Sequence, residues 1–421
     1  MEGPTSGVGG YRPTINIGQA PYLAVPAIYL ATAYGFLVGA SVLLVIHARW
    51  VATGAYGRLP VILMVHLFTV GFLSMTAMGV LHQWVPVVFD VPAVSVRRAL
   101  SHFALYTVSA LVFAFGLAAS NWEAAAIGGG GLALAILLWS AGIWGQLARS
   151  AKPRDAVFHG TRGAVIAFNA VWGLGLYMAL SFLGWWPEGR VLPVHIATAV
   201  VGWMGLLVLT VQQKLNPMFS MSKAEGIRPG IPLYVAGWGV ILAWTSLFTS
   251  PWAFRAGAVL WIAAAVISVG QTVRVVRQGK TRDRVFVGVA SGWLLLLAAS
   301  VLSAGLDPLA VVMAFWGLLT LIFSYQSRVV PFLVAVAVAK RLPGPVFKAF
   351  FMAQAMHVKN QPVVVSGLGL TGAVLSVLAR LMAMPALDVG AGVVAMGLVG
   401  WHILAIAWGM RRGRHQAPIR A

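Results

Sequence analysis

Histidines are the residues of this chain whose type and position could support chemistry. Between His66 and His82 the sequence has no charged residue. An imidazole in such apolar surroundings needs a partner, because an unpaired polar group there is energetically costly. The partner of His66 is either a metal ion bound by the neutral ring or a hydrogen-bonding carbonyl group on a neighbouring helix.

Three other residues enter the same question. His195 follows Pro193 at the start of another apolar run, and is either a second ligand or an interfacial histidine. Met313 is either a sulfur ligand or ordinary apolar filler. His82 is ~24 Å from His66 along a helix, so the two cannot share one ion, and we interpret His82 as interfacial. His402 is a further candidate inside the last apolar run. The remaining histidines are expected to be solvated: His47, His102, His159, His357 and His415.

The elements that must position these residues are membrane-spanning helices. Of 421 residues, 60% are hydrophobic and 9% are charged, whereas soluble domains have about 25% charged residues. About 20 apolar residues in a helix cross a bilayer. The sequence therefore predicts an all-α polytopic membrane protein with twelve transmembrane helices, near 24–47, 60–81, 102–120, 125–147, 163–185, 193–213, 231–250, 253–275, 285–304, 309–328, 362–383 and 387–410.

The distribution of basic residues predicts the orientation. Of the 29 Lys and Arg residues, 24 lie in the N-terminal segment, the even-numbered loops and the C-terminal tail. The other five are Arg49, Arg58, Arg190, Arg255 and Arg380. Under the positive-inside rule this places both termini in the cytoplasm, in a membrane of the bacterial inner (plasma) membrane type. The net charge of +20 is thus interpreted as facing the lipid bilayer, and no nucleic-acid partner is expected.

Missing residue types exclude several cofactors. There is no cysteine, which excludes disulfides, thiolate-bound iron–sulfur clusters and covalently attached c-type heme. The nine carboxylates lie in loops or at span ends, so a proton relay through the membrane is not expected. The whole chain, 1–421, is predicted to be a single transmembrane domain, and 340–361 is predicted to include a cytoplasmic interfacial helix.

Three of the predicted spans share a pattern that ends in proline. The second, sixth and tenth spans end at Pro86, Pro217 and Pro331. A glycine–aromatic pair lies about 15 residues upstream, and small and polar residues recur seven and three residues upstream. The pattern predicts three pseudo-symmetric groups of four helices, approximately 24–147, 163–275 and 285–410. The polar positions are Gln83, Lys214 and Arg328.

Twelve spans in three groups, with a histidine at the outer end of the second, resemble subunit I of the heme-copper oxidase and nitric oxide reductase superfamily. The phrases "HLFTVGF", "KLNPMF" and "SRVVPFLV" are similar to those of divergent stand-alone relatives. The resemblance implies that His66 is an axial ligand of heme b near the outer face, in a cavity between the first and third groups. His195 or Met313 would be the second ligand.

The resemblance also implies what is missing. The paired histidines of the seventh span and the His-x-His of the tenth, which hold copper and the second heme in that family, are absent. No copper and no oxygen-reducing binuclear centre are therefore expected, and the chain is not a complete terminal oxidase. An electron-transfer, heme- or nitric-oxide-related role beside a respiratory or redox partner would remain. The alternatives are a cofactor-free small-solute permease and a structural subunit of a membrane complex.

Overall fold

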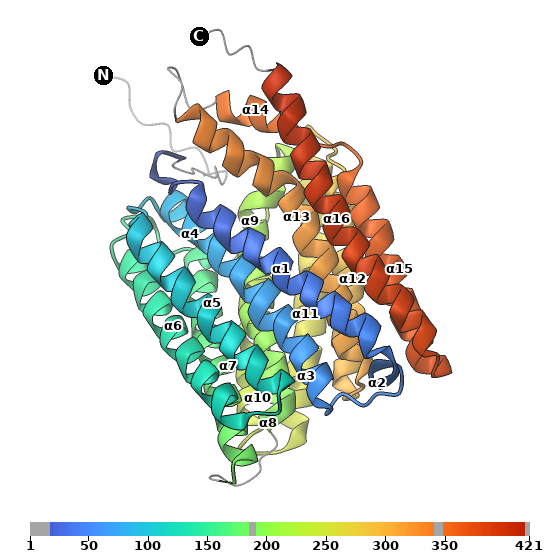
Figure 1. Cartoon of the computed structure of the whole chain (residues 1–421). Helices are drawn as coiled ribbons and strands as arrows, with labels where there is room; N and C mark the ends of the chain where they lie inside the picture. Colours follow the sequence, from blue (N-terminus) through green and yellow to red (C-terminus); the bar gives the residue numbers. More distant parts are fainter. Residues whose placement is uncertain (1–16, 185–190, 341–347, 417–421) are drawn as a thin grey trace, which may run out of the picture.

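The computed structural model describes residues 17–184, 191–340 and 348–416, and all regular structure within them is helical (Figure 1). Eleven helices in these ranges are long and apolar enough to cross a membrane. The expectation of an all-α polytopic membrane protein is therefore confirmed. The elements in chain order are η1 (Ile17–Gln19), α1 (Ala24–Ile46), α2 (Ala48–Ala52), α3 (Leu59–His66), η2 (Leu67–Ser74), α4 (Met75–Phe89), α5 (Val96–Ala118), α6 (Trp122–Ala148), α7 (Ala156–Phe182), α8 (Val191–Ala197), η3 (Thr198–Gly205), α9 (Leu206–Ser220), α10 (Gly230–Thr245), α11 (Pro251–Gln278), α12 (Val285–Ala304), α13 (Leu309–Ala339), α14 (Lys348–Met356), α15 (Gln361–Met382) and α16 (Pro385–Gln416).

The expected count of twelve crossings is not confirmed, because one helix is short. The seventh predicted span, 231–250, corresponds to α10, which has 16 residues. At 1.5 Å per residue it is ~24 Å long, less than the ~30 Å hydrocarbon layer. The other predicted spans correspond to the eleven longer helices.

The three recurring prolines do not end their helices, contrary to the expectation. The second span continues through Pro86 to Phe89, and Asp90 ends it with a left-handed backbone at φ 55°. Pro217 and Pro331 likewise lie inside α9 and α13. A proline removes one backbone donor, and in a membrane bundle neighbouring helices and side chains can satisfy the freed carbonyl.

Two π-helical segments interrupt otherwise α-helical spans, and the sequence pattern did not predict them. Residues 67–74 form η2 in the second span, and residues 198–205 form η3 in the sixth. Each begins 19 residues before the recurring proline, from 67 to Pro86 and from 198 to Pro217. Such segments are frequent at functional sites. They therefore shift the helical register at the same distance from the proline, in the two spans that contain His66 and His195.

The helices pack in the order that three groups of four would give. Each group contains a tightly packed hairpin: α5 with α6, α10 with α11, and α15 with α16. Successive groups then meet through α6 and α7, through α11 and α12, and through α16 and α1, so that the ring closes (Figure 1). Whether the three groups superpose on one another stays a prediction.

The second, sixth and tenth spans form the centre of the bundle. Their most apolar windows are 61%, 61% and 72% buried, whereas no other spanning helix exceeds 44%. Trp203 of η3 donates to Ser74 of η2 over 3.2 Å, and the rings of Phe68 and Phe315 lie 4.2 Å apart. Tyr325 of α13 donates to Asn216 of α9 over 2.9 Å. Each of the three central spans therefore contacts the other two.

The predicted interfacial segment 340–361 contains α14, which packs against α13 and α16 at one end of the bundle (Figure 1). Met356 contacts α16 closely, since a Cβ added to Gly409 would lie 2.1 Å from its carbonyl oxygen. The interfacial role stays a prediction, and residues 341–347 lie outside the described ranges.

Candidate functional site

His66 is the last residue of α3, directly before the π-helical turn. Its Nδ1 lies 2.7 Å from the carbonyl oxygen of Ile62, one turn earlier in its own helix. The ring of Phe113 from α5 packs edge-on against it, with the centroids 5.3 Å apart. The structure therefore gives His66 a hydrogen-bond partner, although on its own helix and not on a neighbouring one.

The space beside His66 is small. A cavity of about 10 Å³ adjoins the ring, between the second span, α1 and α5. Ligand pockets have volumes of about 300–1,000 Å³, and one water needs about 10–15 Å³. The residues that line the cavity beside His66 are Phe36, His66, Leu67, Val70, Gly71, Ala110, Phe113 and Ala114. The ring of His66 packs on Phe113 of α5 in the first group, and Phe68 packs on Phe315 of α13 in the third, so the expected cavity between the first and third groups stays a prediction.

His195 of α8 is the predicted ligand that the structure brings near His66. His195 lies close enough to His66 for a charge on one ring to affect the other, and Nδ1 of His195 is buried without a hydrogen-bond partner. Gly175 of α7 makes room for the ring, since a Cβ there would lie 3.3 Å from Cε1 of His195. The unpartnered Nδ1 lies on the side of the ring that faces α7, 3.8 Å from the position of that Cβ.

Met313 is buried near the start of α13, with 8% of its surface exposed. Met313 belongs to the large hydrophobic core that also includes Phe68 and Phe72 of the second span. The structure thus places His66 and His195 near each other, whereas Met313 is buried on α13.

Heme b fits the donor atoms of this site but not its space. His66 and His195 are two imidazoles, the ligand type of b-type hemes, and one has an unpartnered nitrogen. The ring of Phe113 and the cavity of about 10 Å³ leave no volume for a macrocycle in this conformation. Heme binding would require α5 to move away from the second span.

Three further histidines differ from the expectation. His82, expected to be interfacial, is 6% exposed and packs among the aromatic rings of α1 and α5. His102, expected to be solvated, is half-buried and hydrogen-bonded. His357 is half-buried. Its burial and the charge of Arg328 lower its pKa to about 4, although the charge of Asp283 acts in the opposite direction.

His402, the further candidate in the last span, is fully buried, and its Nδ1 lies 3.0 Å from the side-chain nitrogen of Gln361.

Two of the recurring polar positions pair with acids at the same relative place. Arg328 of α13 donates to Asp283, just before α12, over 2.6 and 2.8 Å. Lys214 of α9 lies 3.8 Å from Asp155, just before α7. Burial alone would raise the pKa of Asp283, but hydrogen bonds and charge from Arg328 hold it below its ordinary value. Asp388, at a span end as expected, is fully buried.

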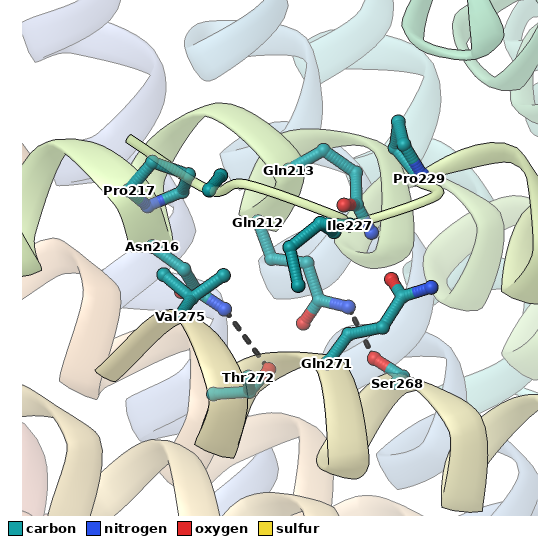
Figure 2. A pocket seen from close by; sticks show the side chains of 11 residues that line it. Gln212, Gln213, Asn216, Pro217, Ile227, Pro229, Ser268, Gln271, Thr272 and Val275 are labelled. Carbon is teal, nitrogen blue, oxygen red and sulfur yellow. Dashed lines mark hydrogen bonds between the residues drawn. The ribbon is translucent and has the colours of Figure 1, made fainter. Parts of the chain in front are cut away.

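A cavity between α9 and α11, lined by both apolar and uncharged polar side chains, is larger than the space beside His66, and sequence reasoning missed it (Figure 2). It has a volume of about 60 Å³. Carboxamides and hydroxyls from the two helices point into it, and the loop at Ile227 and Pro229 covers it. None of the described residues that line it is charged. The lining residues are Gln212, Gln213, Asn216, Pro217, Ala224, Ile227, Pro229, Ser268, Gln271, Thr272 and Val275.

Hydrogen bonds hold several of these groups in place. Gln212 donates to Ser268, and Asn216 donates to Thr272 over 3.1 Å, as Figure 2 shows. Gln271 donates to the carbonyl of Arg228 over 2.8 Å, and its side-chain oxygen is buried without a partner. That oxygen is an acceptor available to a molecule in the cavity.

The network continues into the third group of helices. Trp293 of α12 donates to the oxygen of Gln212 over 3.1 Å, and Tyr325 of α13 donates to Asn216. The sequence signal was polar residues on one face of each helix: Gln212, Gln213 and Asn216 on one, and Ser268, Gln271 and Thr272 on the other. Their spacing of three or four residues follows the helical period.

The comparisons add no relative. The chain matches no protein-family model, and no curated protein matches it. The resemblance to oxidase subunit I therefore rests on the short phrases and the order of helices alone.

Proposed function

We propose that this membrane protein is a cofactor-free permease for small uncharged polar solutes. The observation that supports the proposal is the cavity between α9 and α11, where carboxamides and hydroxyls lie among apolar side chains and none of the described lining residues is charged. Its volume of about 60 Å³ corresponds to roughly four to six water molecules at ~10–15 Å³ each. The solute would be of comparable size, or the cavity would widen to admit it.

The chemistry of the lining favours neutral solutes with N–H or O–H donors. A carboxamide supplies both donors and an acceptor, and the oxygen of Gln271 has no partner in the described part of the chain. An ion would lose its hydration without an opposite charge to replace it, which is costly in a buried site. Uncharged solutes lose only hydrogen bonds that the amides can replace.

Stopped-flow light scattering of proteoliposomes tests the permease. With urea and glycerol as probes, we expect faster solute entry than in protein-free liposomes. Gln271→Leu should slow this entry about fivefold to tenfold, since a hydrogen bond of about 1–1.5 kcal/mol is lost. Gln354→Leu, the same change at an exposed position of α14, is the matched control. Entry no faster than in protein-free liposomes, or equal loss in both variants, would overturn the proposal.

Heme b binding is the second candidate, and the proximity of His66 and His195 favours it. It would carry the electron-transfer, heme- or nitric-oxide-related role that the resemblance implies, beside a respiratory or redox partner. Absorption spectra of the purified protein, oxidised and dithionite-reduced, decide it. A Soret band that His66→Ala abolishes and His402→Ala keeps would favour heme. If protein made in heme-replete cells shows no Soret band, the permease and the structural subunit remain as the candidate functions.

A further inference from the structure

Three ring side chains form a cluster where α1, α4 and α5 meet. This cluster is separate from the cavity between α9 and α11, called the amide cavity below. The phenol oxygen of Tyr29 lies 2.6 Å from Nδ1 of His102. The ring of His82 is 5.2 Å from that of Tyr29 and 6.4 Å from that of His102, measured between centroids. Tyr29 is fully buried and His82 is 6% exposed. Two imidazoles and a phenol from three helices thus share one buried place.

The hydrogen bonds assign the proton on His102. Its Nε2 lies 3.2 Å from the carbonyl oxygen of Ala135 in α6, and a carbonyl only accepts, so Nε2 carries the hydrogen. The lone pair of the neutral ring is then on Nδ1, directed at the phenol oxygen of Tyr29. A hydrogen bond from the distal ring nitrogen to a carbonyl is the usual support of a metal-binding histidine.

The same place has further unused donor capacity. Nε2 of His82 is buried without a hydrogen-bond partner. The hydroxyl of Tyr29 also lies 3.2 Å from the carbonyl of Ala99. When its hydrogen turns there, the phenol oxygen and Nδ1 of His102 face each other with lone pairs only. A cation bound beside both atoms would relieve that repulsion, with the phenol oxygen and Nδ1 moving apart to roughly 3.3 Å, the spacing of two ligands at ~2.0 Å from one tetrahedral ion.

Gly79 permits the cluster to form. A Cβ at Gly79 would lie 2.8 Å from Cβ of Tyr29, closer than real side chains approach. Only glycine therefore lets α1 approach α4 closely enough to bring Tyr29 beside His82. His102 is half-buried, so the cluster can exchange ions from its side.

We propose that Tyr29, His82 and His102 form a binding site for one divalent transition-metal ion, Cu²⁺ or Zn²⁺. The ligands would be Nε2 of His82, Nδ1 of His102 and the phenolate oxygen of Tyr29. Imidazole nitrogen suits both ions, and three protein ligands leave a fourth position for water. Binding replaces the phenol proton, which leaves to solvent, and no electron is transferred. In the described ranges no three His, Asp or Glu side chains gather to hold a metal, so the phenol completes this set.

Copper titration of the purified full-length protein, followed by electron paramagnetic resonance, tests the site. We expect one Cu²⁺ per chain, with nitrogen couplings from two imidazoles and a visible phenolate-to-copper charge-transfer band. Competition with Zn²⁺ should remove both signals. The proposed transport plays no part in this experiment, so either proposal can fail alone.

Variants separate the site from other copper-binding positions. Tyr29→Phe should lose the charge-transfer band and keep both nitrogen couplings. His82→Ala should lose one coupling and weaken binding roughly tenfold or more. His159→Ala, at an exposed histidine, should change neither. A spectrum that is the same in wild type and His82→Ala would mean an adventitious ion only, and absence of binding at one equivalent would equally overturn the site.

Discussion

At the scale of residues, polar side chains in this bundle differ in how completely they are paired. Arg328 is 3% exposed and makes two hydrogen bonds with Asp283. Lys214 and Asp155 form the corresponding contact with 13% and 41% of their side chains exposed. Similar sequence positions therefore carry different electrostatic energies, because burial determines how much solvent screens each pair.

Asp283→Asn should destabilise the protein by about 3–5 kcal/mol, because it leaves the buried guanidinium of Arg328 without its counter-charge. Asp155→Asn removes the exposed contact and keeps a side-chain oxygen for the start of α7, so it should cost less than about 1 kcal/mol. Thermal unfolding in one detergent measures both. A smaller shift for Asp283→Asn than for Asp155→Asn would contradict the expectation.

The stability of the native state should also depend on pH through His357. Its pKa is lowered to about 4, whereas an unfolded histidine titrates near 6.5. The unfolded chain therefore binds the extra proton first, and the free energy of unfolding falls between about pH 6.5 and pH 4, by up to ~3 kcal/mol. In the His357→Gln variant, the midpoint of unfolding should change less with pH over that window. Asp283 is distinguishable, because its lowered pKa gives a loss only below about pH 4.

The sequence alone identified the histidines that lie in apolar surroundings, but it did not predict their hydrogen-bond partners. His66 was identified from its apolar surroundings, and its partner depends on rotamer and helix contacts that the sequence does not encode locally. The amide cavity was missed for a related reason. Gln212 and Ser268 lie 56 residues apart, and only the packing of α9 on α11 turns their polar faces toward each other.

At the scale of elements, hydropathy predicted where the spans lie, and close packing determines how they meet. The run of four glycines at 128–131 in α6 is an example. A Cβ at Gly128 would lie 2.2 Å from the backbone nitrogen of Phe113 in α5, whereas one at Gly130 would meet nothing within 4 Å. Small residues let helix backbones approach in membranes. The π-helical turns, by contrast, left no recognisable signal in the residue pattern.

Gly128→Ala should destabilise the α5–α6 hairpin by about 1–3 kcal/mol, because the added methyl group pushes two backbones apart. Gly130→Ala in the same run should be neutral or stabilising by about 0.5–1 kcal/mol, from helix propensity alone. Unfolding midpoints of the two variants provide the measurement. Equal shifts would mean that α5 and α6 do not cross closely at Gly128.

At the scale of the whole molecule, the start of α1 and the end of α16 lie at the same end of the bundle (Figure 1). The distribution of basic residues predicts that this end faces the cytoplasm. A C-terminal fusion should therefore make a cytoplasmic reporter active and a periplasmic one inactive. A fusion in the α1–α3 connection, near Gly57, should give the opposite result. Activity of the periplasmic reporter at the C-terminus would reverse the assigned orientation.

The contact between α1 and α16 has a consequence for how the protein is made. A Cβ at Gly392 of α16 would lie 2.6 Å from the side chain of Val45 in α1, so the two helices meet closely. The ribosome delivers α1 well before α16, and domains otherwise fold as they emerge. During synthesis the face of α1 that α16 will cover must be held by lipid or by an insertion factor. The ring can close only after α16 has been made, so termination before α16 would leave that face of α1 uncovered and open to quality-control proteases.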